Sequence, residues 1–278
     1  MSVHKAWPDA KTGLFGIIGH PVAHSMSPAM HHAAFRALGL NAVYLAFDVT
    51  DLDAALSGVR GLGIKGVSIT IPHKEAVLRF LDEIDPVAQR IGAVNTIVNR
   101  SGRLSGINTD CTGALSAIEE VTSLRGRKVL VLGAGGAARA VCAGLADRGA
   151  AVHVANRTPE RARALAEAFN LTWSGLERLG DIEADILINT TSIGMGPDYN
   201  ETPMEKGFLG SFEVVMDIVY SPLKTRLLKE AGDAGCKTIN GLNMLLYQAE
   251  AQFEFWTGQK APRDSMKGAL NAVLDPHP

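Results

Sequence analysis

Two ionisable residues in the first half of the chain, Lys74 and Asp110, are of the types that move protons in enzymes. Each lies shortly after a segment with the apolar pattern of a β-strand, at residues 66–71 and 103–107. A lysine beside a carboxylate can exchange a proton with an alcohol or a ketone, while the carboxylate orients the lysine. The pair therefore indicates acid–base chemistry at a carbon–oxygen bond. Taken singly, each has an ordinary explanation: a solvated side chain for Lys74 and a first-turn helix charge for Asp110.

Other polar residues follow the predicted strands of the same half. Because active sites of open α/β sheets form at the carboxyl ends of strands, we expect these residues to converge on one cleft. The hydroxyls of Ser25 and Ser27 lie near the start of a predicted helix and suit a carboxylate. Ser27 is also a predicted N-cap, with Pro28 at the first helical position. The converging set comprises Ser25, Ser27, Thr70, Lys74, Asn95, Asn108 and Asp110.

The stretch around Gly133 has the pattern of a dinucleotide-binding turn. Gly133, Gly135 and Ala138 have the G-x-G-x-x-A spacing, directly after the apolar strand predicted at residues 129–132. Gly133 would allow a sharp turn, Gly135 would let the backbone approach a pyrophosphate, and Ala138 would let the next helix pack on the sheet. An ordinary strand–turn–helix connection can use the same glycines. A P-loop is excluded because no Gly-Lys-Ser/Thr follows.

The second strand of this βαβ unit, predicted at residues 151–155, ends without an acid. An NAD enzyme usually has Asp or Glu there to bind the ribose 2′-hydroxyl. This chain has Asn156, Arg157 and Thr158, with Arg161 a turn later. A guanidinium can grip a 2′-phosphate in a fork, and a helix opened by Thr158 as N-cap supplies further donors. The sequence therefore predicts NADP(H) rather than NAD.

Composition bounds the class of protein. The 278 residues are 46% hydrophobic and 20% charged, with a formal net charge of −2, so neither nucleic acid nor membrane is expected as a partner. The three cysteines, Cys111, Cys142 and Cys236, are an odd number at wide spacing, which favours a reducing compartment. Residues 1–13 lack an apolar signal core. We expect a cytoplasmic protein that is a monomer or a homodimer, and no metal site, because no acid or cysteine stands at ligand spacing from the histidines.

The order of elements predicts an α/β fold in two domains. An N-terminal α/β domain takes residues 1–110 and 241–278, and a doubly wound Rossmann-type domain takes 111–240, with the C-terminal helices returning to the first domain. Strands are expected at residues 14–18, 42–49, 66–71, 93–99, 103–107, 129–132, 151–155, 185–189, 214–218 and 237–239. Helices are expected to follow Pro28 and Gly135 and at residues 50–62 (with Asp53 completing a capping box), 75–81, 109–122, 159–169, 224–234, 241–256 and 263–274.

The motifs in this order resemble the shikimate dehydrogenase family over nearly the whole chain. The first four are Gly19-His20-Pro21-Val22-Ala23-His24-Ser25-Met26-Ser27-Pro28, Ser68-Ile69-Thr70-Ile71-Pro72-His73-Lys74, Gly92-Ala93-Val94-Asn95-Thr96 and Gly106-Ile107-Asn108-Thr109-Asp110. After the glycine turn and Asn156-Arg157-Thr158 come Asn189-Thr190-Thr191-Ser192-Ile193-Gly194-Met195, Asp217-Ile218-Val219-Tyr220 and Asn240-Gly241-Leu242-Asn243-Met244-Leu245-Leu246-Tyr247-Gln248.

The resemblance implies NADPH-dependent reduction of 3-dehydroshikimate to shikimate, in the pathway to chorismate and the aromatic amino acids. Lys74 and Asp110 would be the catalytic pair. The substrate carboxylate would bind Ser25, Ser27 and Tyr220, and the ring hydroxyls would bind Thr70, Lys74, Asn95, Asp110 and Gln248. The cofactor would contact Gly133, Ala134, Gly135, Gly136, Ala137, Asn156, Arg157, Thr158, Arg161, Thr190, Ser192, Met195, Ile218, Gly241 and Met244. Two residues depart from the family pattern: Ser68, usually Asn, and Asn243, usually Gly.

Several alternatives remain. A quinate or mixed quinate/shikimate dehydrogenase would use the same scaffold, although the missing acid disfavours strict NAD use. A non-catalytic NADP-binding redox sensor would not need Lys74 and Asp110. Glutamyl-tRNA reductase needs a cysteine nucleophile and a tRNA-binding extension, for which this chain is too short. We expect His73 to be structural, Cys111 to be unreactive, and Phe253, Phe255 and Trp256 to lie on a buried helix face.

Overall fold

The computed structural model describes residues 8–274; residues 1–7, where no signal sequence is expected, and 275–278 lie outside the described part. The described residues divide into two compact units. The first unit contains the residues up to Thr109 and those from Ala249 onward, and the second contains residues 110–248. Asp110 and residues 241–248, which the predicted division gives to the first domain, are thus grouped here with the second unit. Among residues 8–274, no helix combines the length and the apolar character needed to cross a membrane.

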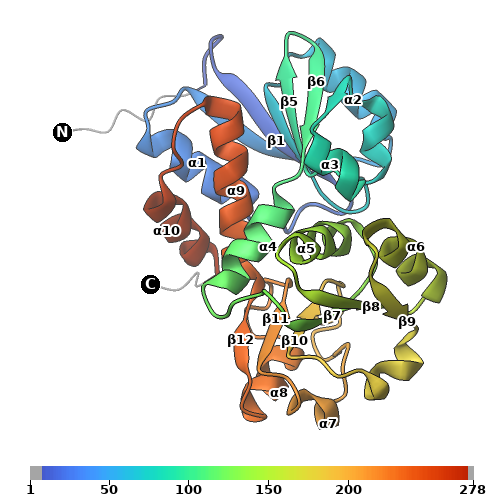
Figure 1. The fold of residues 1–278 in the computed structure, drawn as a ribbon. Coiled ribbons are helices and arrows are strands. Elements are labelled where there is room, and N and C mark those ends of the chain that lie inside the picture. The colour runs from blue at the N-terminus through green and yellow to red at the C-terminus, as the bar shows by residue number, and fades with distance from the viewer. Residues whose placement is uncertain (1–7, 275–278) are drawn as a thin grey trace. The chain divides into compact units, whose positions relative to one another are not determined.

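The first unit contains a six-stranded mixed sheet with the order β2-β1-β3-β5-β6-β4 (Figure 1). Parallel pairing joins β1 to β2 and β3, whereas β5 is antiparallel to β3 and β6. The predicted hairpin is confirmed, since Arg100 pairs with Arg103 at its turn. The strands are β1 (Gly13–Gly19), β2 (Ala42–Asp48), β3 (Gly66–Ile69), β4 (Glu83–Ile84), β5 (Thr96–Arg100) and β6 (Arg103–Ile107).

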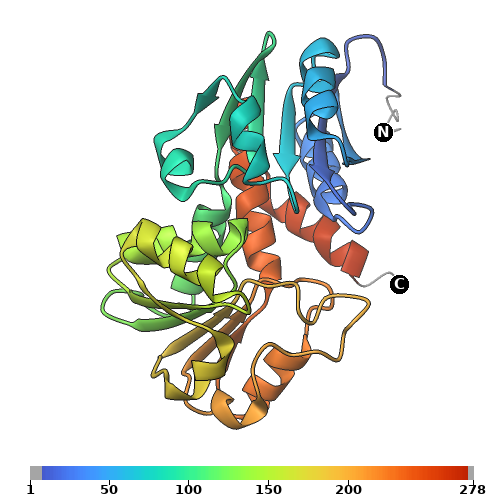
Figure 2. The ribbon, with the colours of Figure 1, turned by 90° about the vertical axis from the view of Figure 1, so that its right-hand side faces the viewer.

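Helices cover this sheet from two parts of the chain. Those close in sequence are α1 (Ser27–Ala37), α2 (Leu52–Gly61), the 3₁₀ helix η1 (Ala76–Phe80) and α3 (Pro86–Ile91). From the C-terminal end come the last part of α9 (Gly241–Thr257) and α10 (Arg263–Leu274), and α10 packs beside α1 (Figure 1, Figure 2). The indole of Trp256 lies over Gly66, where a Cβ would overlap the ring, and Trp256 Nε1 donates to Ile97 O at 2.9 Å. The predicted return of the C-terminal helices is confirmed by these contacts.

Three local predictions for the first unit are wrong. Ser27 is not the N-cap of α1: the cap is Met26, without a side-chain bond. The capping box around Asp53 is not formed, because Asp51 caps α2 by accepting from the Ala54 N–H. The helix predicted at residues 75–81 is confirmed, and it is the short 3₁₀ helix η1. Phe255 is 54% exposed, because it lies on the opposite face of α9 from the fully buried Phe253.

The second unit contains a six-stranded parallel sheet with the order β12-β11-β10-β7-β8-β9. Numbered within the unit this is 6-5-4-1-2-3, the strand order of a dinucleotide-binding Rossmann fold. The predicted fold class is therefore confirmed. The strands are β7 (Lys128–Leu132), β8 (Ala151–Ala155), β9 (Thr172–Ser174), β10 (Ile186–Asn189), β11 (Val214–Asp217) and β12 (Lys237–Ile239). Of these, β9 escaped prediction because it is only three residues long and two of them are exposed.

Both faces of this sheet are buried, as the continuous apolar runs of its strands indicate. Val129 and Val131 of β7 belong to one hydrophobic core with Val141 of α5. The alternating residues Leu130 and Leu132 belong to another core on the other face. The helices of the unit are α4 (Asp110–Glu119), α5 (Gly136–Asp147), α6 (Pro159–Phe169), η2 (Leu176–Asp181), α7 (Lys206–Leu209), α8 (Arg226–Asp233) and the start of α9.

Candidate functional site

The turn between β7 and α5 has the geometry expected of a pyrophosphate cradle. Gly133 has φ +111°, a conformation that L side chains rarely adopt, and a Cβ there would lie 2.6 Å from Thr190 Oγ1. Gly135 is the N-cap of α5, and a Cβ added to it would meet no heavy atom within 4 Å. Ala138 is fully buried against the sheet. The open space at Gly135, in front of the first N–H groups of α5, fits an anionic group such as a pyrophosphate.

The end of β8 presents cations at the same edge of the sheet. Asn156 Nδ2 donates to the Thr158 carbonyl oxygen at 3.0 Å, which closes the turn that leads into α6. Thr158 is the N-cap of α6 but makes no side-chain cap bond, and Pro159 follows it at the first helical position. Arg157 and Arg161 are both exposed here. Two guanidinium groups beside a helix N-terminus suit a 2′-phosphate better than a neutral ribose hydroxyl.

A buried carboxylate at the end of β11 was missed by sequence reasoning. Asp217 is fully buried, and its carboxylate accepts from Asn189 Nδ2 at 3.0 Å, from Val219 N–H at 3.0 Å and from Thr225 Oγ1 at 2.7 Å. Burial raises its pKa to about 6, although the three donors oppose that rise. The sequence feature that could have revealed Asp217 is its place at the end of an apolar strand, where a buried residue is expected.

In the first unit, the two predicted carboxylate-binding serines lie in one turn. The Ser27 N–H donates to Ser25 Oγ at 3.3 Å, and Ser25 N–H donates to the Val22 carbonyl oxygen at 3.0 Å. Ser27 is 4% exposed, and its side chain hydrogen-bonds the hydroxyl of Tyr44, whose pKa is raised by burial. The Ser27 hydroxyl therefore packs against β2 instead of capping its own helix.

Backbone hydrogen bonds bring together the segments that carry Thr70, Lys74 and Asn95. Val94 N–H donates to the Lys74 carbonyl oxygen at 2.8 Å, and Ile69 N–H donates to the Asn95 carbonyl oxygen at 2.8 Å. His73 N–H donates to the Thr70 carbonyl oxygen, which folds the loop after β3 into a turn. Three of the predicted substrate residues thus lie at one edge of the first sheet.

The amide of Asn95 is held in one orientation. Its Oδ1 accepts from Thr109 N–H and from Thr96 Oγ1, both at 2.8 Å. Its Nδ2 donates to Thr109 Oγ1 at 2.9 Å. Because Oδ1 already accepts two short hydrogen bonds, the amide is fixed with its nitrogen as the donor side. The neighbouring Asn108 Nδ2 donates to the Ala93 carbonyl oxygen, so its amide supports the loop.

Asp110 and Gln248 lie on two helices of the second unit that pack against each other. Asp110 is the first residue of α4 and is 4% exposed. One turn later, Gly113 packs so closely on α9 that a Cβ would lie 2.7 Å from Met244 O and 3.0 Å from Gln248 Cβ. Residues three apart share a helix face, so Asp110 and Gln248 project from facing helices. Asn243, one of the two departures, donates from Nδ2 to Glu120 Oε2 at 3.1 Å, just after the end of α4.

The histidines have structural surroundings. His73 Nε2 is 2.7 Å from the Val49 carbonyl oxygen and the residue is 7% exposed, in keeping with its predicted structural role. His31 stacks on Tyr44 with ring centroids 4.4 Å apart. Complete burial lowers the pKa of His31 to about 3, so this imidazole is neutral. His32 Nε2 accepts from the Tyr44 N–H at 2.9 Å.

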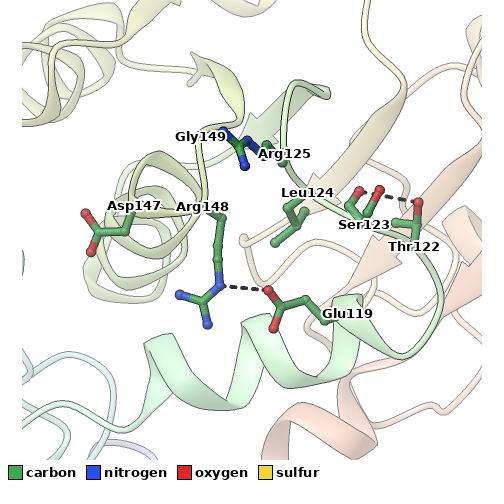
Figure 3. Close-up of a pocket in the computed structure, with 8 residues that line it drawn as sticks. All are labelled: Glu119, Thr122, Ser123, Leu124, Arg125, Asp147, Arg148 and Gly149. Carbon is green, nitrogen blue, oxygen red and sulfur yellow. Dashed lines mark hydrogen bonds and ion pairs between the residues drawn. The ribbon is translucent and has the colours of Figure 1, made fainter.

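A hollow of about 700 Å³ lies elsewhere in the second unit (Figure 3). Its lining includes Arg125, which precedes β7, and Gly149, which precedes β8, so it lies at the amino-terminal edge of the sheet. Arg148 Nε donates to Glu119 Oε1 at 2.7 Å within it, so two of its charges neutralise each other. None of the predicted site residues lines this hollow, and it is not assigned to the chemistry.

Comparisons with known proteins agree with the geometry. Three family models match: "Shikimate dehydrogenase substrate binding domain" at residues 17–97, "Shikimate / quinate 5-dehydrogenase" at 116–195 and "Shikimate 5'-dehydrogenase C-terminal domain" at 241–270. The chain is 52% identical to the NADP(+) shikimate dehydrogenase of Thermococcus kodakarensis, over 94% of this chain and 97% of that protein.

Solved structures resemble nearly the whole chain as well. A shikimate dehydrogenase in complex with NADP+ has a TM-score of 0.90 and 44% identity, with 97% of this chain and 98% of that chain covered. The shikimate 5-dehydrogenase of Thermus thermophilus, in complex with NADP(H) and shikimate, has a TM-score of 0.87 and 44% identity, with 95% and 100% covered. The family predicted from the ordered motifs is confirmed, and the chain belongs to the shikimate dehydrogenase family.

Proposed function

We propose that this protein catalyses the reversible, NADPH-dependent reduction of 3-dehydroshikimate to shikimate, in the pathway to chorismate and the aromatic amino acids. The observation that carries the proposal is the 52% identity, over 94% of the chain, to a curated NADP(+) shikimate dehydrogenase. The site geometry supports it, because the glycine turn and the polar loops of the first unit are of the types that the reaction needs.

The second unit supplies the cofactor site in this proposal. Gly133, Ala134, Gly135, Gly136 and Ala137 hold the pyrophosphate, and Asn156, Arg157, Thr158 and Arg161 hold the adenosine with its 2′-phosphate. The absence of an acid after β8 removes the repulsion that a 2′-phosphate would meet in an NAD site. The remaining cofactor residues are Thr190, Ser192, Met195, Ile218, Gly241 and Met244. NADPH supplies the hydride that reduces the ketone.

The proposed substrate ligands outside the catalytic pair are all neutral. Ser25, Ser27 and Tyr220 bind the substrate carboxylate, and Thr70, Asn95 and Gln248 bind its ring oxygens. With its amide fixed as described, Asn95 donates from Nδ2 to a substrate oxygen. Neutral donors around the substrate carboxylate bind this anion without any need to bury a lysine or an arginine there.

Lys74 and Asp110 are the proton-transfer pair. Negative charge develops on the ketone oxygen as hydride arrives, so the Lys74 ammonium stabilises that oxygen and donates its proton there. Asp110 accepts a hydrogen bond from the ammonium and so orients it, and it accepts from the substrate hydroxyl once that oxygen carries the proton. In the reverse direction, Lys74 accepts the hydroxyl proton of shikimate. A non-catalytic sensor would have no use for this pair.

We further infer that the protein works in the cytoplasm, as a monomer or a homodimer with a small molecule as substrate. The charge of −2 and the reduced cysteines agree with that setting.

The decisive experiment follows the loss of NADPH absorbance with 3-dehydroshikimate in the purified protein. We expect rapid oxidation of NADPH and much slower oxidation of NADH. Quinate with NAD or NADP serves as the control for the mixed-specificity alternative, and we expect little turnover. Absence of NADPH oxidation with 3-dehydroshikimate, in a protein that binds NADPH, would favour the sensor instead.

A further inference from the structure

We infer that Asp217 is the positioning residue of the nicotinamide half of the cofactor site, acting through the buried hydrogen bonds of Asn189 and Thr225. This inference rests on the proposed function, because it concerns the site that the cofactor would occupy. None of the three residues is among those predicted to touch cofactor or substrate. Their role follows from what their hydrogen bonds hold in place.

The carboxylate joins the ends of two neighbouring strands. Asn189 is the last residue of β10 and Asp217 the last residue of β11, and the two residues pair in the sheet. Asn189 Nδ2 and Val219 N–H donate to Asp217 Oδ1, and Thr225 Oγ1 donates to Oδ2. One buried charge thereby fixes the exits of both strands and the beginning of α8, since Thr225 also caps that helix by accepting from Leu228 N–H at 3.3 Å.

The hydrogen bonds continue from Asn189 into the loop after β10. Asn189 Oδ1 accepts from Thr191 N–H at 3.0 Å and from Thr191 Oγ1 at 2.7 Å. Thr191 Oγ1 in turn accepts from Ile193 N–H at 3.2 Å. The left-handed Gly194, at φ +90°, brings the loop back onto Thr225, with a built Cβ 3.6 Å from Thr225 Cβ. This loop contains Thr190, Ser192 and Met195, three of the proposed cofactor residues.

The loop after β11 is held by the same carboxylate. It runs from Ile218 to Thr225 and includes Tyr220, a proposed ligand of the substrate carboxylate. Val219 N–H is bonded to Asp217 Oδ1, and the Val219 carbonyl oxygen accepts from Gly241 N–H at 3.3 Å. The position of Tyr220 therefore depends on a residue three positions earlier in the chain.

The strand order indicates which half of a dinucleotide the loops after β10 and β11 face. In a sheet of this strand order the ligand binds at the carboxyl ends of the strands, across the point where β7 separates β8 from β10. The 2′-phosphate site follows β8, on one side of that point. The loops after β10 and β11 lie on the other side, where the nicotinamide half must extend. Thr190 Oγ1 also donates to Leu132 O at 2.6 Å, which ties the first of these loops to the glycine turn.

The test compares two ligands on the full-length protein by calorimetry. NADP+ spans the whole site, whereas adenosine 2′,5′-bisphosphate occupies only the half near Arg157. For Asp217→Asn and for Thr225→Val we expect NADP+ to bind about tenfold more weakly, the scale of one lost charge-assisted hydrogen bond, while the fragment binds within about twofold of the unaltered protein. Thr225→Ser keeps the hydroxyl and should restore NADP+ binding.

Two further variants separate positioning from stability. Asp51→Ala removes the N-cap of α2 in the first unit, so it should lower Tm as Thr225→Val does without changing NADP+ affinity. Thr191→Val removes the hydrogen bond from Thr191 Oγ1 to Asn189 Oδ1 at a half-buried position. It should weaken NADP+ binding even if Asp217→Asn fails to fold.

Three results would overturn the inference. The first is NADP+ affinity within about twofold of the parent in Asp217→Asn, Thr225→Val and Thr191→Val. The second is an equal loss for the fragment and for NADP+, which would reveal general destabilisation. The third is an unaltered protein that does not bind NADP+ at all, which would overturn the proposed function and this inference together. In the first two results the unaltered protein binds NADP+ normally, so failure of the inference can be told apart from failure of the proposed function.

Discussion

The Tyr44 hydroxyl donates to Ser68 Oγ at 2.6 Å, and Ser68 Oγ donates to Gln252 Oε1 at 2.8 Å. Gln252 Nε2 completes the chain by donating to Thr96 Oγ1 at 2.9 Å and to the Asn95 carbonyl oxygen at 3.2 Å. These buried hydrogen bonds connect Ser27, which contacts Tyr44, with Asn95. Ser68, where the family usually has asparagine, thus has a partner in this chain that matches its single hydroxyl.

Removal of the Ser68 hydroxyl should destabilise the protein. In Ser68→Ala, the Tyr44 hydroxyl and Gln252 Oε1 each lose a buried partner, at a cost of about 1–3 kcal/mol in the free energy of unfolding. Chemical denaturation measures this, with Ser57→Ala on an exposed position of α2 as the control. If the network is real, Tyr44→Phe combined with Ser68→Ala should cost less than the sum of the two. Strict additivity would contradict the hydrogen bond.

Arg157 should determine the choice of cofactor. Arg157→Ala removes the guanidinium proposed to bind the 2′-phosphate, so KM for NADPH should rise while KM for NADH changes little. Arg161→Ala should have a smaller effect of the same kind. Steady-state kinetics with both cofactors measures the change. Equal use of NADPH and NADH by the unaltered protein would contradict the assignment.

Ser27 should affect substrate binding and not the start of its helix. Since Met26 is the N-cap of α1, Ser27→Ala loses no cap. It loses the proposed donor to the substrate carboxylate, worth about 1.5–3 kcal/mol in binding, and its contact with Tyr44. Ser25→Ala and Tyr220→Phe should likewise raise KM for shikimate more than KM for NADP+. A fall in Tm with unchanged substrate KM would leave Ser27 a structural role only.

Lys74 and Asp110 should act on kcat. A donor to the developing oxyanion works chiefly in the transition state, so Lys74→Met should lower kcat by about 10²–10⁴-fold with a smaller change in KM. Asp110→Asn keeps the shape and removes the charge. If the two act as one unit, the double variant should be little worse than the worse single variant. NADPH binding and Tm near those of the parent are the controls, and near-parent kcat in Lys74→Met would show that the proton comes from elsewhere.

Burial of neutral His31 should make the protein sensitive to acid. Its folded pKa is lowered to about 3 from an ordinary 6.5, so the unfolded chain binds the proton first as pH falls. The contribution is complete above pH 6.5 and is lost between pH 6.5 and pH 3, on the order of 5 kcal/mol at most. His31→Gln should therefore flatten the loss of stability in that window, measured by denaturation at several pH values. The exposed His24→Gln should leave it unchanged.

The sequence alone determined those strands and turns that depend only on residues near one another in the chain. Apolar runs with β-branched residues predicted β7 and β8 correctly, because strands buried on both faces need no partner information. Gly133, Gly135 and Ala138 predicted the turn, because left-handed backbone and close packing restrict which residues fit. The order of the motifs along the chain was sufficient to identify the family. The roles given to Lys74, Asp110 and the other site residues stay predictions.

Tertiary structure decided whatever depends on partners distant in sequence. Ser27 looked like a cap because serine before proline often is one, but in the folded chain Met26 is the cap residue and Ser27 is buried beside Tyr44 of β2. Phe255 matched an apolar helix face, yet the sheet of the first unit covers only the side with Phe253 and Trp256. Asp217 accepts hydrogen bonds from more than one segment because β10 and β11 are paired in the sheet. A buried carboxylate needs hydrogen-bond donors, and the sequence alone does not show which strands will supply them.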